Sequence, residues 1–170
     1  MSEKFTVGII VSNHFGVLSR VAGLYAKRGY NIDSLAVGVT ENPAYSRMTI
    51  VSTGDEYMKA QVVRQLEKLH DVKMVTVFEK GSAVSNEHML IKIRASGTSK
   101  AKISEMINNY GGKVVDFSGE FITAELTGSP EKIERLIDEA RNIGILELCR
   151  SGLISMVHGM EKALGIGNLD

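Results

Sequence analysis

The stretch "NHFGVLSR", which begins at Asn13, joins a strand pattern to a helix pattern and holds the residues best suited to bind a ligand. The Asn13 side-chain oxygen can cap the start of the helix, and Gly16 lacks a Cβ, so a ligand can approach the backbone closely. The first turn of a helix offers unpaired N–H groups and a partial positive charge, which together bind a small anion such as a carboxylate. Three hydrophobic side chains would line a wall beside these groups: Phe15, Val17 and Leu18. The combination predicts a site for an α-amino acid with an aliphatic side chain, although a purely structural turn also explains the glycine.

No other part of the sequence has residues spaced for catalysis or for metal binding. The histidines, His14, His70, His88 and His158, form neither an HExxH motif nor a close pair with the single cysteine, Cys149. We therefore expect no metal site, and we expect His14 to be a solvent-facing residue of its loop. Cys149 is expected to be a structural thiol, because no histidine base is near it in the sequence. The sequence also lacks the nucleophile-elbow and P-loop motifs.

The composition is that of an ordinary globular protein. The 170 residues are 44% hydrophobic and 24% charged, and 20 basic residues balance 20 acidic ones. Because there is no basic excess, the sequence does not favour nucleic acid or an anionic membrane as a partner. No hydrophobic run is long enough to span a bilayer, and "MSEKFTVGIIVSN" lacks the features of a signal peptide. We therefore expect a soluble, cytoplasmic protein, with little charge repulsion against self-association.

The first half of the chain has the pattern of a βαββαβ unit, in which two helices pack on one face of a four-stranded antiparallel sheet. Alternating hydrophobic residues indicate strands, and spacings of three and four indicate helices. The predicted elements are a strand over 5–11, a helix over 17–25 that Gly29 ends, strands over 31–40 and around 48–50, a helix that Asp55 caps, and a strand over 72–78. Arg47 is expected either to face solvent or to contact a partner.

The same order of elements returns after a polar segment without periodicity, residues 81–88, which reads as a linker. Helical spacing runs from Ile103 to Tyr110, and Ser129 with Pro130 marks the start of the last helix. The sequence thus predicts an α+β protein of two tandem ferredoxin-like domains, with boundaries at 1–80 for the first, 81–88 for the linker, and 89–170 for the second with a C-terminal tail.

The opening stretch carries a resemblance to a known family. "NHFGVLSRVAGLYAKRGYNIDSL" resembles the start of an ACT domain, the ferredoxin-like module that binds amino acids. "GVLSRVAGLYAKRGYNIDSLAVG", "NPAYSRMTIV", "LHDVKMV" and "MLIKI" resemble, more narrowly, the small regulatory subunit of acetolactate synthase (acetohydroxyacid synthase). The likeness extends over nearly the whole chain and is strongest over residues 13–53.

This resemblance implies a chain that has no catalytic activity and needs no cofactor of its own. Such subunits bind a large catalytic subunit, which carries thiamine diphosphate, magnesium and FAD. They raise its activity and confer feedback inhibition by valine, and in some cases by leucine or isoleucine. The implied partners are therefore the large subunit, a branched-chain amino acid and a second copy of the chain.

The resemblance also implies which residues hold the effector, at an interface between two ACT domains that pair edge to edge. The first loop of one chain supplies Asn13, His14, Phe15, Gly16, Val17 and Leu18. The neighbouring chain supplies Asn31 and Ile32, and Gln61 on the second helix matches a position near the site. His14 and Phe15 depart from the small or acidic residues common in relatives, and Phe15 would narrow the pocket.

Two other classes of function fit the predicted fold. A different ACT-type amino-acid sensor is one, but a transcription regulator of this kind would need a DNA-binding segment, which the sequence lacks. A free-standing enzyme on a ferredoxin-like scaffold, such as an acylphosphatase-like hydrolase, is the other. That enzyme would need an arginine in the first loop, whereas Arg20 lies one turn into the predicted helix.

Overall fold

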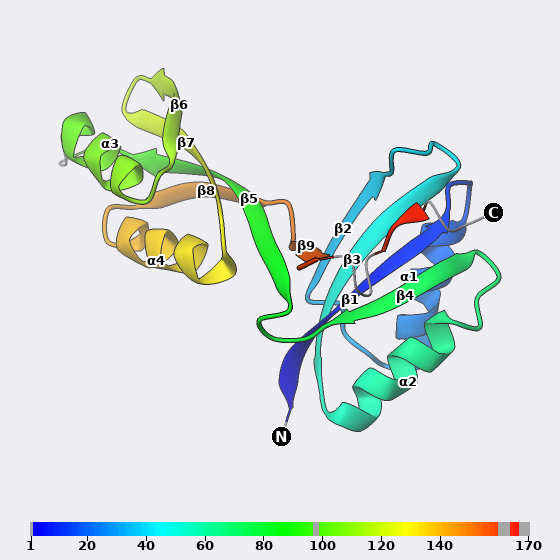
Figure 1. Cartoon of the computed structure of the whole chain (residues 1–170). Helices are drawn as coiled ribbons and strands as arrows, with labels where there is room; N and C mark the ends of the chain where they lie inside the picture. The colour runs from blue at the N-terminus through cyan, green and yellow to red at the C-terminus, as the bar shows by residue number, and fades with distance from the viewer. Residues whose placement is uncertain (1, 97–98, 160–163, 167–170) are drawn as a thin grey trace. The chain divides into compact units, whose positions relative to one another are not determined.

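The computed structural model describes residues 2–96, 99–159 and 164–166. The chain forms two compact units, one from Met1–Val84 with Leu153–Asp170 and the other from Ser85–Gly152. The helices and strands are, in order, β1 (Glu3–Ser12), α1 (Val17–Lys27), β2 (Ser34–Val39), β3 (Tyr45–Gly54), α2 (Glu56–Leu66), β4 (Val72–Phe78), β5 (Ala83–Arg94), α3 (Lys100–Asn109), β6 (Lys113–Ser118), β7 (Phe121–Gly128), α4 (Pro130–Arg141), β8 (Ile145–Arg150) and β9 (Ile154–Val157) (Figure 1).

The first unit is built on an antiparallel sheet of strand order β2-β3-β1-β4. Val7 on β1 lies opposite Ile50 on β3, and Ile9 lies opposite Met48, so hydrophobic residues of both central strands share one face. That face packs against α1 and α2 through Val21 and other buried side chains. The predicted βαββαβ unit is confirmed.

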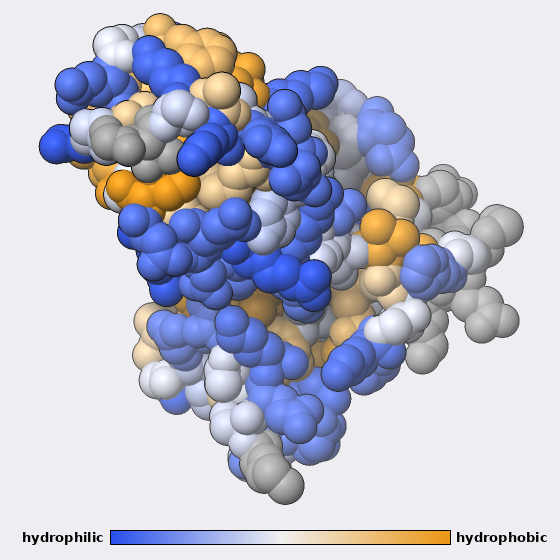
Figure 2. Space-filling view, turned by 90° about the vertical axis from the view of Figure 1, so that its left-hand side faces the viewer, coloured by the Kyte–Doolittle hydropathy of each residue, from blue (hydrophilic) through white to orange (hydrophobic). Residues whose placement is uncertain are grey.

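The second unit repeats this arrangement, with strand order β6-β7-β5-β8 and helices α3 and α4. Ile91 on β5 faces Ala124 on β7, and both lie in a core with Ile103 of α3 and Leu136 of α4. Most of its exposed large hydrophobic side chains come from the edge strands, Val115 and Phe117 on β6 and Leu146 and Leu148 on β8, and Leu90 on the central strand β5 is also exposed. Figure 2, which views the side of the molecule on the left in Figure 1, shows a largely hydrophilic surface with separated hydrophobic areas. The predicted α+β class with two ferredoxin-like units is confirmed.

Short-range capping fixes where the helices begin and end. The Asp55 side chain accepts a hydrogen bond from the Met58 N–H at the start of α2, and Ser129 caps α4 in the same way, as predicted. Gly29 follows α1 with a φ of 67°, a left-handed conformation that glycine adopts without a steric penalty. These three signals depend only on neighbouring residues.

The expected linker over 81–88 is wrong from Ala83 onward, because β5 begins there. Polar residues in this part of β5 find partners far away in the sequence. The buried Glu87 carboxylate accepts hydrogen bonds from Nε and Nη2 of Arg150, at 2.7 and 2.9 Å, and Arg150 also donates to Glu134. A buried carboxylate needs such a partner, so a polar segment can belong to an ordered strand.

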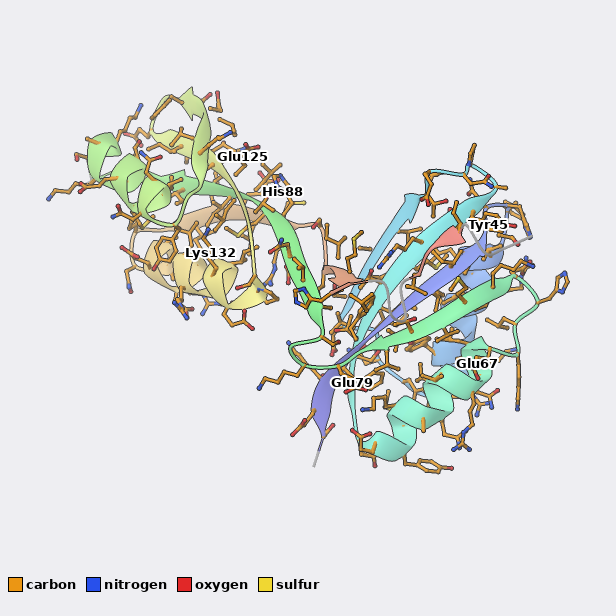
Figure 3. The ribbon with its side chains drawn as sticks, in the orientation of Figure 1. Tyr45, Glu67, Glu79, His88, Glu125 and Lys132 are labelled. Carbon is orange, nitrogen blue, oxygen red and sulfur yellow. The ribbon has the colours of Figure 1, made fainter. Side chains whose placement is uncertain are left out.

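The tail also differs from the expectation, because residues from Leu153 onward belong to the first unit rather than to the second. Leu164 packs with Ile10 and Phe78 in a cluster that also includes Tyr45, which Figure 3 labels. Ile10 alternates with Ile9 along β1, so this cluster lies on the face of the sheet opposite α1 and α2. The described part of the tail therefore covers the second face of the first sheet.

Two hydrogen bonds hold the tail on this face. The Leu153 N–H donates to the Ser34 Oγ on β2 at 3.0 Å, and Arg47 on β3 donates from Nη2 to the Ser155 carbonyl at 2.5 Å. Arg47 is partly buried here, so it contacts the chain's own tail instead of facing solvent freely. A Cβ added to Gly8 would lie 2.6 Å from Leu164 Cδ1, which shows how closely the tail approaches β1.

Leu164→Ala should lower the free energy of unfolding by about 2 kcal/mol, because it leaves a cavity over Ile10 and Phe78. Amide hydrogen exchange measured on β1 should speed up accordingly. Leu146→Ala is the matched control, since Leu146 is 53% exposed and its loss should change stability by less than about 0.5 kcal/mol. Unchanged exchange on β1 in Leu164→Ala would contradict the packing of the tail on this sheet.

Candidate functional site

The first loop is tied at its base to two other turns of the first unit. The Ser12 N–H donates to the Asp71 carbonyl at 2.8 Å, and the Asn13 N–H donates to the Ala44 carbonyl at 2.7 Å. The Asn13 side chain donates from Nδ2 to the Pro43 carbonyl at 2.8 Å, so the predicted helix cap by Asn13 is wrong. The turn between β2 and β3 competes successfully for this amide, and Asn13 fixes the loop to that turn instead.

Gly16 is the residue from which α1 starts. Its φ of 85° is left-handed, and its carbonyl accepts the first helical hydrogen bond, from the Arg20 N–H at 3.0 Å. No side-chain oxygen caps this helix among the described residues. The first-turn N–H groups are therefore left to another acceptor, which is the property that the sequence predicted for an anion site.

The hydrophobic side chains of the loop divide between the core and the surface. Val17 is only 3% exposed and packs in the core of the first unit, so it cannot line a ligand wall as expected. Phe15 is fully exposed and Leu18 is 43% exposed. A wall beside the helix start is thus available from Phe15 and Leu18 alone, and a fully exposed Phe15 has room for a partner to cover it.

The other residues expected at the site lie elsewhere in the first unit. Asn31 is exposed and donates from Nδ2 to Asp33 Oδ1 at 2.6 Å, and it precedes β2 instead of beginning it. Ile32 packs partly against the core, and Gln61 is half-buried on α2. Within the described part of this single chain, no hydrogen bond joins these three side chains to the first loop.

The sequence did not predict a role for Asp71. Its carboxylate binds one side chain of the loop and one side chain of the first helix. Asp71 Oδ1 lies 2.9 Å from His14 Nε2, and Asp71 Oδ2 lies 2.7 Å from Arg20 Nε. The Asp71 side chain is 12% exposed, whereas those of His14 and Arg20 are about half exposed. His14 is exposed, as expected, but it is also held by a carboxylate, which was not expected. The only signal in the sequence is an acidic residue directly before the strand pattern of β4.

The environment of Asp71 favours its charged form. Burial on its own would raise the pKa of the Asp71 carboxyl, but the Arg20 hydrogen bond and charge, with those of His14, outweigh burial and lower the pKa below its usual range. Asp71 is consequently an anionic anchor for the loop at neutral pH. Its two partners come from opposite ends of the Gly16 turn, so the anchor fixes the direction in which α1 starts.

The rest of the described chain offers no arrangement typical of catalysis. No group of three or more His, Cys, Asp or Glu residues that could hold a metal ion occurs in it. Cys149 is exposed, and the neighbouring Arg150 is engaged by Glu87 and Glu134. No described helix has both the length and the hydrophobicity to cross a membrane.

Comparisons with known proteins match both units. A family model described as "AHAS small subunit-like ACT domain" matches residues 7–74, and one described as "Small subunit of acetolactate synthase" matches residues 86–159. The first match covers the loop, Gly16 and Asp71, and the second covers the core of the second unit.

Full-length relatives match over almost the whole chain. The chain is 43% identical to the acetolactate synthase small subunit of Mycolicibacterium smegmatis, over 95% of this chain and 94% of the relative. It is 42% identical to the probable small subunit of Archaeoglobus fulgidus, over 94% of this chain and 99% of the relative. The crystal structure of the small subunit from Thermotoga maritima superposes with a TM-score of 0.86 at 33% identity, covering 93% of this chain and 99% of that one. The chain therefore belongs to the acetolactate synthase small subunit family, with an ACT domain as its first unit.

Proposed function

We propose that this chain is a non-catalytic, cytoplasmic regulatory subunit that binds a branched-chain amino acid, with valine preferred, and passes the bound state to the catalytic large subunit of acetolactate synthase. The observation that carries the proposal is the start of α1 at Gly16, where no side chain caps the helix and the loop stays exposed. Membership in the small subunit family supports the assignment of the partner.

The chemistry of the loop suits an amino acid. The carboxylate of the effector accepts hydrogen bonds from the first-turn N–H groups of α1, where the helix dipole also favours a negative charge. Its aliphatic side chain packs against Leu18 and Phe15. Asn31 and Ile32 of a second copy close the site, with Gln61 nearby, and the Asn31 amide can bond either the ammonium or the carboxylate.

The exposed edge of the first sheet supports a homodimer. β2 is an edge strand, and its side chains Val37 and Val39 are 48% and 62% exposed. An edge strand presents unpaired N–H and C=O groups, which pair readily with the same edge of another copy. Pairing of two β2 strands would extend the sheet and cover these valines.

The effector acts by favouring one arrangement of the complex over another, because a ligand that binds both arrangements equally shifts nothing. Typical coupling free energies between two sites are about 1–3 kcal/mol. In this scheme the large subunit carries thiamine diphosphate, magnesium and FAD, and the small subunit contributes binding only.

A free-standing enzyme is the less favoured alternative. A ferredoxin-like hydrolase would need an arginine free to bind substrate beside the first loop. The guanidinium of Arg20 is instead held by Asp71, which argues for a structural role. Another ACT-type sensor remains the second alternative, and the choice of effector separates it from the main proposal.

Gly16→Asp should abolish valine binding measured by isothermal titration calorimetry. The new carboxylate would repel the effector, and a side chain at a φ of 85° is strained. Gly119→Asp is the matched control, because Gly119 also has a positive φ, 57°, but lies in the turn between β6 and β7. Normal valine binding by Gly16→Asp would contradict the placement of the site. The absence of heat with valine, leucine and isoleucine in the unmodified protein would contradict the sensor itself.

Asp71→Asn should weaken valine binding roughly threefold or more, because the loop loses a charged anchor on His14 and Arg20. The depressed pKa of Asp71 makes its contribution to stability pH-dependent. A carboxylate whose pKa is lowered in the folded state stabilises the fold fully above its unfolded pKa, and the contribution is lost as pH falls through the folded pKa.

The melting temperature of Asp71→Asn should therefore be lower than that of the unmodified protein at pH 7, and the difference should shrink towards pH 3. Asp138→Asn removes a carboxylate from an exposed pair with Arg141 and should behave like the unmodified protein. If the melting temperature of Asp71→Asn is lower than that of the unmodified protein by the same amount at every pH, the charge of Asp71 is not the cause of the lower stability.

Reconstitution with the acetolactate synthase large subunit of the same organism tests the function directly. Adding this chain should raise the rate of acetolactate formation, and valine should then inhibit the complex more strongly than the large subunit alone. The Gly16→Asp chain should still activate but should not confer the inhibition. A chain that neither binds nor activates the large subunit would overturn the proposed function.

A further inference from the structure

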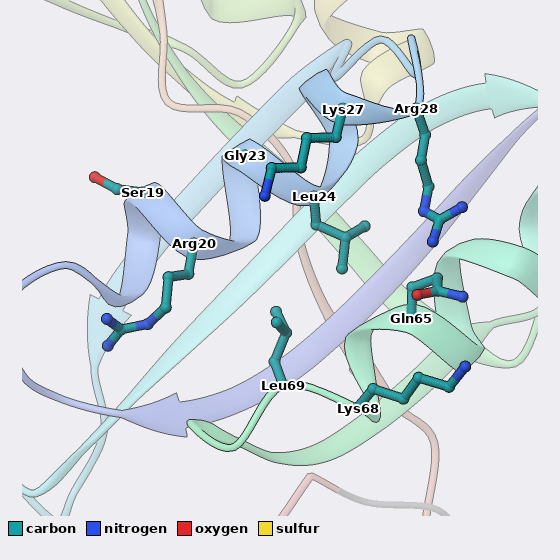
Figure 4. A pocket seen from close by; sticks show the side chains of 9 residues that line it. All are labelled: Ser19, Arg20, Gly23, Leu24, Lys27, Arg28, Gln65, Lys68 and Leu69. Atoms are coloured by element: carbon teal, nitrogen blue, oxygen red, sulfur yellow. The ribbon is translucent and has the colours of Figure 1, made fainter.

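A groove of about 760 Å³ lies between α1 and α2 of the first unit, on the side of the helices away from the sheet (Figure 4). Leu24 of α1 and Leu69, which follows α2, point towards each other and form its hydrophobic floor. Both side chains are partly buried against the core, so the floor is fixed by the fold.

The groove is basic although the chain as a whole has no net charge. Four cationic side chains line it, and no carboxylate does: Arg20, Lys27, Arg28 and Lys68. Arg20 is bound to Asp71, whereas no ion pair within the described chain engages the other three. Three uncommitted cations around a hydrophobic floor favour an acidic, partly hydrophobic partner.

Gly23 shows how closely that partner can approach. It lies in the middle of α1, where glycine is less favourable for helix formation than alanine. A Cβ added to Gly23 would meet nothing within 4 Å, so packing within the chain does not require the glycine. Ser19 lies one turn earlier on the same face, and together these small residues leave room for the backbone of another helix.

The same features argue against a small anion as the occupant. Lys27 is the last residue of α1 and Arg28 follows it as the C-terminal cap, so this end of the groove has helix carbonyl groups, not N–H donors. Lys68 likewise follows the end of α2. The carboxylate side chains of a helical partner segment can reach these separate cations on their long side chains. A phosphate bound at the same place would find no backbone N–H groups to donate to it.

We propose that this groove binds an acidic amphipathic helix of the catalytic large subunit, seated over Gly23 with its carboxylates towards Lys27, Arg28 and Lys68. The inference rests on the proposed function, because it takes the large subunit as the partner. It also connects the groove with the effector loop. Arg20 lines the groove and binds the same Asp71 carboxylate that holds His14.

The first test fills the groove at Gly23. Gly23→Leu should weaken binding to the immobilised large subunit at least tenfold, measured by surface plasmon resonance, although it should leave the melting temperature unchanged or higher because leucine favours helix. Gly23→Ala is the graded control. Its affinity for the large subunit should stay within about threefold of that of the unmodified chain, and its melting temperature should be higher. If Gly23→Leu binds like the unmodified chain, the groove is not the docking site.

The second test reverses the charges. Lys27→Glu/Arg28→Glu/Lys68→Glu should weaken binding at least about tenfold at low salt and should flatten the dependence of affinity on salt. The matched control, Lys4→Glu/Lys80→Glu/Lys102→Glu, reverses three exposed lysines outside the groove. Its affinity for the large subunit should stay within about threefold of that of the unmodified chain. Equal losses in both triple variants would overturn the proposal, because they would show only a general charge effect. Failure of the unmodified chain to bind would instead overturn the proposed function.

Discussion

The first unit depends on burying both faces of one strand. Val7, Ile9, Ile10 and Val11 of β1 are all fully buried, although neighbouring residues of a strand point to opposite sides of the sheet. α1 and α2 cover one side, and the tail covers the other through Leu164. Because both faces of β1 are covered, the centre of the sheet offers no surface to a ligand. Recognition is left to the ends and edges of the unit, where the Gly16 loop, β2 and the groove lie.

The loop is exposed but not free. Asn13 binds the turn at Pro43, and Asp71 binds His14 and Arg20, so the backbone around Gly16 is held from both sides. A preorganised helix start loses little conformational entropy when a carboxylate binds to it. Phe15, by contrast, has no such support and is fully exposed. The loop thus combines a helix start held in place by side-chain contacts with an exposed hydrophobic side chain.

Features set by neighbouring residues were predictable from the sequence, and those set by distant partners were not. The strand at 5–11, the caps at Asp55 and Ser129 and the turn at Gly29 follow from local periodicity and capping chemistry. The cap expected from Asn13 failed because a carbonyl thirty residues away binds its amide.

Contacts between residues distant in the sequence also explain the other differences between the predicted and the observed structure. The polar start of β5 resembled a linker because its ion-pair partner, Arg150, lies 63 residues away. Asp71 was missed because its role appears only when β4 is placed beside the first loop. Buried polar groups are ordered by partners that periodicity does not reveal. Among the residues predicted for the site, Gly16 was predicted from backbone conformation and helix-terminus chemistry, whereas Asn31, Ile32 and Gln61 were predicted only from the family resemblance.

The return of the tail to the first sheet has a consequence for how the protein is made. The first unit contains residues from both ends of the chain, while the second unit comes from one continuous segment between them. During synthesis all residues of the second unit have emerged once Gly152 has, but the hydrophobic cluster around Ile10 and Phe78 is complete only after Leu164 follows. The unit whose translation begins first is thus completed last, and part of the hydrophobic face of its sheet stays exposed in the meantime.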